Sequence, residues 1–62
     1  MPIVRVELSP GRSYEQKTKY VEEVTNLTSD ILKCPVESID VMFVEIHATD
    51  WAHAGKFYAQ PK

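Results

Sequence analysis

The sequence predicts a small α/β domain: a single β-α-β unit with parallel strands, followed by a short C-terminal hairpin. Two observations predict it. Two short runs rich in apolar and β-branched residues, 2–8 and 39–46, flank one long segment of helical periodicity, 13–33. The chain has only 62 residues, so these elements fill one domain over 1–62. A strand, a crossover helix and a second strand form a βαβ unit, whose crossover is expected to be right-handed.

Residues 2–8 are expected to form the first strand. The apolar residues Val4, Val6 and Leu8 alternate with charged ones, which is typical of a strand with one apolar face. The Pro-Gly pair at 10–11 then breaks the pattern, because both residues favour turns.

Residues 13–33 are expected to form one helix. Ser13 is the predicted N-cap, and Gln16 three residues later completes a capping box. Lys33 lies where the helix dipole favours a cation, and Pro35 prevents the helix from continuing. Apolar side chains recur along it at helical spacing: Tyr20, Val24, Leu27 and Ile31.

Residues 39–46 are expected to form the second strand. Its centre, 41–44, is apolar on both faces, which predicts burial on both sides. A loop or short hairpin is expected over 49–57, followed by a tail over 58–62. Two strands with apolar faces are not stable alone, so other chains are expected to cover them.

The size of the chain also predicts a homo-oligomer. A core this small rarely contributes more than about 3–5 kcal/mol. Cys34 is the only cysteine and has no partner for an internal disulfide. Together with His47 and His53 it is too sparse for a structural zinc site, so no metal or other cofactor is expected.

Charge and hydropathy exclude two kinds of partner. The formal net charge is −2, with 7 Lys and Arg against 9 Asp and Glu, and there is no basic run to attract nucleic acid. No apolar stretch is long enough to span a membrane. The single thiol suits a reducing compartment, so a cytoplasmic location is expected.

Three residues are candidates for chemistry. Removal of Met1 would leave Pro2 with a free secondary amine whose direction the ring fixes. An α-amino group has a reference pKa of about 7.7–8.0, so it needs only a small shift to be a neutral base. Arg12 could bind a carboxylate through two parallel hydrogen bonds, or could simply be exposed. Trp51 could be an apolar wall beside the amine or an anchor at a subunit interface.

A set of motifs follows in a fixed order along the chain: Met1-Pro2-Ile3, Gly11-Arg12-Ser13, Glu15-Gln16-Lys17, Pro35 and the aromatic Trp51. In these motifs the chain resembles the 4-oxalocrotonate tautomerase family. The resemblance implies dimers that share a four-stranded sheet, usually assembled as a hexamer, a trimer of dimers. It also implies that Pro2 moves a proton in the enol or dienol form of a small 2-oxo acid. Arg12 would bind the substrate carboxylate, and Trp51 would occupy the place of an active-site aromatic residue.

Two positions depart from the family pattern. Asp40 stands where well-known members carry a second arginine, and a carboxylate there would repel a dicarboxylate substrate. His53 could activate water or replace the missing cation, or could be exposed to solvent. Two alternatives therefore stay open: a hydratase or dehalogenase acting on an unsaturated acid, and a non-catalytic subunit of a hetero-oligomer.

Overall fold

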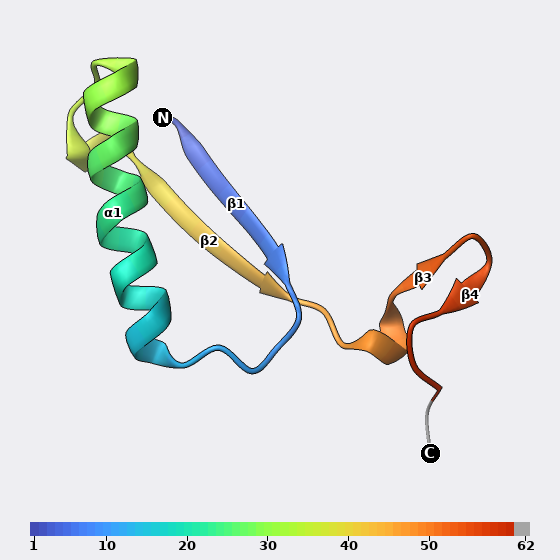
Figure 1. Cartoon of the computed structure of the whole chain (residues 1–62). Coiled ribbons are helices and arrows are strands. Elements are labelled where there is room, and N and C mark those ends of the chain that lie inside the picture. Colours follow the sequence, from blue (N-terminus) through green and yellow to red (C-terminus); the bar gives the residue numbers. More distant parts are fainter. Residues whose placement is uncertain (61–62) are drawn as a thin grey trace.

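The computed structural model describes residues 1–60 and has the predicted β-α-β order, followed by a short hairpin (Figure 1). Strands β1 and β2 pair in parallel, and β3 and β4 pair antiparallel, which confirms the predicted fold class. Two 3-10 turns, η1 and η2, were not predicted. The elements are β1 (Ile3–Leu8), α1 (Tyr14–Leu32), η1 (Val36–Ser38), β2 (Asp40–Glu45), η2 (Ala48–Asp50), β3 (Ala52–His53) and β4 (Lys56–Phe57).

The parallel pair runs in register from Ile3 opposite Asp40 to Leu8 opposite Glu45. Burial alternates along β1, as the period-two pattern predicted. The strand begins one residue later than expected. Pro2 has no N–H to donate, but its carbonyl accepts a hydrogen bond from the Asp40 N–H at 3.1 Å.

The predicted capping box begins α1. The Ser13 hydroxyl accepts from the Gln16 N–H at 3.1 Å, and the Gln16 side chain accepts from the Ser13 N–H at 2.9 Å. The other end differs from the prediction. Lys33 is the C-cap in the left-handed conformation, with φ of 57°, and the last turn holds no basic residue. The Ser29 hydroxyl closes this end by donating to the Cys34 carbonyl at 2.6 Å.

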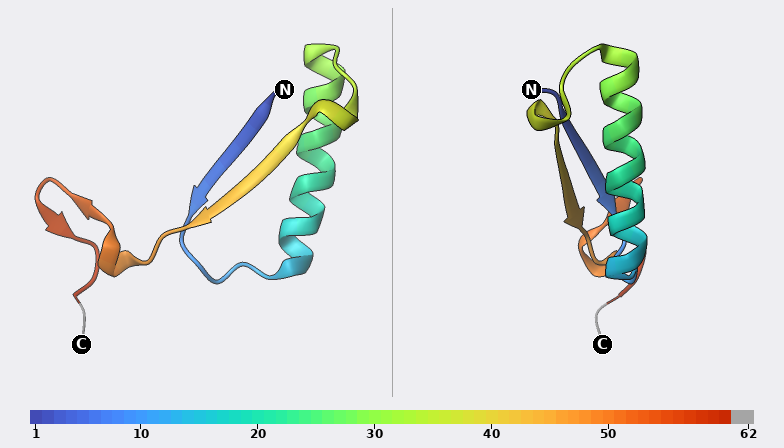
Figure 2. Two further views of the ribbon diagram at one scale, coloured as in Figure 1. Left: turned by 180° about the vertical axis from the view of Figure 1, so that it is seen from behind. Right: turned by 90° about the vertical axis from the view of Figure 1, so that its left-hand side faces the viewer.

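Helix α1 covers one face of the two-stranded sheet (Figures 1 and 2). The Tyr20 and Phe43 rings meet with centroids 6.0 Å apart. The predicted apolar stripe only partly contacts the sheet, because two strands are too narrow to cover all of it. The half-buried positions of the helix are Lys17, Val21, Val24, Thr25, Thr28 and Ser29. Leu27, Ile31 and Leu32 remain 58%, 63% and 60% exposed.

The single chain has almost no core. Among the described residues, Ile39 is the one hydrophobic side chain that is buried, at 9% exposure. Met42 on β2 is 43% exposed, so the predicted burial of both strand faces is not achieved within one chain. The hairpin extends away from the helix and sheet, and the chain measures 46 × 25 × 14 Å (Figures 1 and 2). Within the described part of the chain, no helix has the length and hydropathy needed to cross a membrane.

Candidate active site

Pro2 is fixed at the start of β1. Its carbonyl bonds to Asp40 on the neighbouring strand, and the Met1 amine donates to the Ser38 carbonyl at 2.6 Å. While Met1 is attached, the Pro2 nitrogen is a tertiary amide with no proton and no useful basicity. Removal of Met1 would expose a secondary amine at the edge of a hydrogen-bonded strand pair.

Arg12 lies in the loop between β1 and α1. Gly11 precedes it with φ of +119°, a backbone conformation that residues with a side chain rarely adopt. The N-cap Ser13 follows it. The loop is thus anchored at both ends, because the Leu8 carbonyl accepts from the Ile46 N–H at 2.9 Å on the other side. This arrangement places Arg12 among the residues that line a groove between α1 and the sheet.

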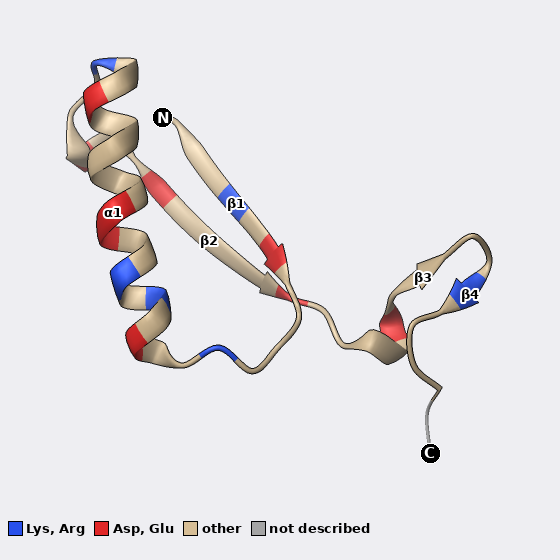
Figure 3. Ribbon diagram, viewed as in Figure 1, with Lys and Arg blue, Asp and Glu red and all other residues tan. Residues whose placement is uncertain are grey.

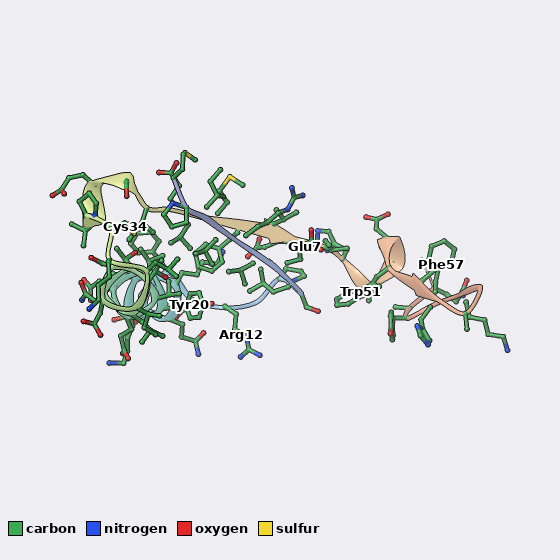
Figure 4. The ribbon with its side chains drawn as sticks, turned by 90° about the horizontal axis from the view of Figure 1, so that it is seen from above. Glu7, Arg12, Tyr20, Cys34, Trp51 and Phe57 are labelled. Atoms are coloured by element: carbon green, nitrogen blue, oxygen red, sulfur yellow. The ribbon has the colours of Figure 1, made fainter. Side chains whose placement is uncertain are left out.

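The groove has a volume of about 360 Å³, and both apolar and polar side chains line it. Its walls are mainly apolar: Val6, Leu8, Tyr20 and Phe43. Its polar rim comes from Arg12, Gln16 and Lys17. Arg12 has no carboxylate partner among the described residues, whereas Lys17 is paired with Glu45 at 2.6 Å. Figure 4 shows Arg12 and Tyr20 on the same side of the sheet. An apolar cleft with an unpaired guanidinium at its rim suits a small organic anion.

The hairpin gathers an aromatic cluster around Tyr58. The Trp51 and Tyr58 rings meet edge to face with centroids 5.2 Å apart, and the His53 ring lies 6.5 Å from Tyr58. The Tyr58 N–H also donates to the Trp51 carbonyl at 2.8 Å. The sequence analysis missed Tyr58, because only the pairing of Ala52 with Phe57 brings it to Trp51. Trp51 and His53 are therefore neighbours, and both are exposed.

The structure does not bring Pro2 and Arg12 together within one chain. They lie at opposite ends of β1, and a strand of this length spans about 20 Å (Figure 1). Trp51 and His53 lie beyond the end of β2, at the Arg12 end of the sheet. The sequence analysis did not anticipate this separation, although Pro2 begins the predicted first strand and Arg12 follows its end. Asp40 is the charged residue that starts β2 beside Pro2.

The sequence matches the family described as "Tautomerase enzyme" over residues 2–60. This chain belongs to the tautomerase family. A probable tautomerase of Listeria innocua is 42% identical over 55 residues, which cover 89% of this chain and 90% of the relative. The family match confirms the resemblance that the proline start and the Gly-Arg-Ser motif indicated.

Solved tautomerase structures share the fold. The 4-oxalocrotonate tautomerase homologue YwhB is 33% identical, with a TM-score of 0.87 over 98% of this chain and 100% of its own. The homologue TTHB242 is 29% identical, with a TM-score of 0.87 over 100% of this chain and 98% of its own. The tautomerase fold thus extends over the hairpin as well as the β-α-β unit. In residues 1–60 of this tautomerase chain, no three His, Cys, Asp or Glu side chains lie close enough to hold a metal ion.

Proposed function

We propose that this tautomerase-family chain is an isomerase that converts enol forms of small 2-oxo acids to their keto forms. Pro2, freed by removal of Met1, is the general base. The observation that carries the proposal is the family match, which extends from Pro2 across the described chain. The anchoring of Pro2 at the strand start supports it, because a base must be held in one direction to act efficiently.

The proposed reaction is a proton transfer without a cofactor. The neutral Pro2 amine takes the proton of the enol hydroxyl, and the oxygen becomes the carbonyl as the carbon–carbon double bond shifts. The protonated amine then returns the proton to carbon, so no net proton is gained or lost. The Arg12 guanidinium holds the substrate carboxylate through two parallel N–H···O bonds.

The separation of Pro2 from Arg12 makes a second copy part of this proposal. A two-fold axis beside an edge strand runs the second copy antiparallel to the first, so the start of one β1 lies near the end of the other. Pro2 of one copy would then approach Arg12 of its partner. Dimers that share a four-stranded sheet, assembled as a homo-hexamer, would also cover the faces that the single chain leaves open.

The test is turnover by the processed protein of 2-hydroxymuconate and phenylenolpyruvate, followed by absorbance. Pro2→Ala leaves a freely rotating primary amine in place of the ring-held secondary amine, so it is expected to lower kcat/KM by about 10²-fold through lost orientation. In the parent, kcat/KM should rise with pH as the amine loses its proton, with an apparent pKa at or below about 7.7–8.0.

Two controls make this result decisive. Intact-mass measurement must show that Met1 is absent from both proteins, because an acylated proline is no base. Circular dichroism must show that Pro2→Ala is folded. Equal turnover by folded protein that retains Met1 would exclude the proposed base, because its Pro2 nitrogen is an amide.

A further inference from the structure

Two cations occupy neighbouring positions at the start of α1. Counting from the N-cap Ser13, Arg12 is N′ and Lys17 is N4, the two positions whose side chains pack against each other at helix starts. Apolar residues are usual there, but here both positions are basic and both line the groove. Figure 3 shows basic positions in the loop before α1 and in the first half of α1, and an acidic position at the end of β2.

Glu45 compensates one of the two charges. Its carboxylate oxygen lies 2.6 Å from the Lys17 ammonium, which also lies 5.5 Å from the centre of the Phe43 ring. The Lys17 side chain is 25% exposed and that of Glu45 is 38% exposed, so this pair is better shielded than the other ion pairs of the described chain. Arg12 is thus the one groove cation without a carboxylate partner in residues 1–60.

We propose that Glu45 sets the substrate charge that this site accepts. By pairing Lys17, it leaves a single uncompensated cation, Arg12, above apolar walls. The site then prefers an enol acid with one carboxylate and an apolar substituent over a dicarboxylate. This inference rests on the proposed role of Arg12 as the carboxylate-binding group, and it adds a specificity-determining residue that does not itself touch the substrate.

The test compares kcat/KM for phenylenolpyruvate, a monocarboxylate, with that for 2-hydroxymuconate, a dicarboxylate. Glu45→Gln frees the Lys17 charge and is expected to shift the ratio toward the dicarboxylate about five- to tenfold. Lys17→Gln leaves the Glu45 carboxylate uncompensated and should shift the ratio the opposite way. The double variant removes both charges and should return close to the parental ratio.

A purely structural role for the pair predicts a different pattern. Both single variants would then lose activity on both substrates in parallel, so the ratio would stay at the parental value in the single and the double variants. Glu23→Gln is the matched control, since it frees Lys19 from an exposed pair at 2.9 Å on the same helix, outside the groove lining. Its ratio should stay within about twofold of the parent, because solvent screens an exposed charge.

Binding provides a readout that needs no turnover. Benzoate and cis,cis-muconate are titrated against ¹⁵N-labelled protein, and the Arg12 and Gln16 amide shifts report their affinities. Glu45→Gln should favour muconate over benzoate by the same factor as in kinetics. If the affinities for the two ligands change as expected but the protein turns over neither substrate, the proposed function is contradicted and this inference stands. An unchanged ratio in Glu45→Gln and in Lys17→Gln would overturn it.

Discussion

At the scale of single residues, the two groups that carry the proposed chemistry are held in different ways. Pro2 is held by the sheet, because its carbonyl is part of the β1–β2 ladder. Arg12 is held by the loop that enters the helix, between a positive-φ glycine and the N-cap Ser13. The backbone at each position is fixed by main-chain geometry, so substitutions of the side chains test chemistry with little effect on the fold.

Arg12→Ala is expected to raise KM for an enol acid about 10- to 100-fold, because charge-assisted hydrogen bonds to a carboxylate are lost. Arg12→Lys keeps the charge but not the two parallel donors, so its KM should be intermediate. Steady-state kinetics on phenylenolpyruvate measures both. Lys19→Ala is the control, because Lys19 is an exposed cation outside the groove lining. Its partner is Glu23, whose hydrogen bond and charge raise the pKa of Lys19. An Arg12→Ala enzyme with parental KM would remove the carboxylate-binding role.

At the scale of elements, local sequence signals predicted the structure well. The capping box, the alternation of β1 and the β-α-β order all depend on residues close in the chain, and all three are confirmed. The helix face that packs on the sheet was predicted less well, because the two-stranded sheet decides which part of a wide apolar stripe is covered. The cluster around Tyr58 depends on the register of the hairpin, which no local sequence pattern predicted.

The capping box gives a prediction at this scale. Ser13→Ala removes the hydroxyl that accepts from the Gln16 N–H, so the free energy of unfolding should fall by about 1 kcal/mol. Urea denaturation followed by circular dichroism measures this loss. Ser9→Ala is a matched control, because the Ser9 side chain makes no hydrogen bond to the described residues. Equal stability of the two variants would mean that the cap contributes nothing.

At the scale of the whole molecule, the chain is far from compact. Its radius of gyration is 15.1 Å, whereas a globular domain of this length has about 11 Å. The difference reflects the projecting hairpin and the open faces of helix and sheet (Figure 2). Such a shape exposes apolar surface in water and is typical of a subunit whose core is completed by other copies.

Folding and assembly should therefore be inseparable. On dilution, the far-ultraviolet circular dichroism signal and the sedimentation coefficient are expected to fall together, because a released monomer has too little core to remain folded. Parallel measurements over a dilution series test this. A folded monomer at the lowest concentration would contradict it and would leave the exposed apolar surface unexplained.

The placement of Pro2 and Arg12 at opposite ends of β1 makes complementation between two variant chains possible. If each site takes Pro2 from one copy and Arg12 from its partner, two variants that each lose most of their activity at low substrate concentration can complement each other. Pro2→Ala and Arg12→Ala chains, unfolded together and refolded in equal amounts, form mixed dimers in which one site has both residues intact. Random pairing would restore about a quarter of the parental activity, whereas sites built within single chains would restore none.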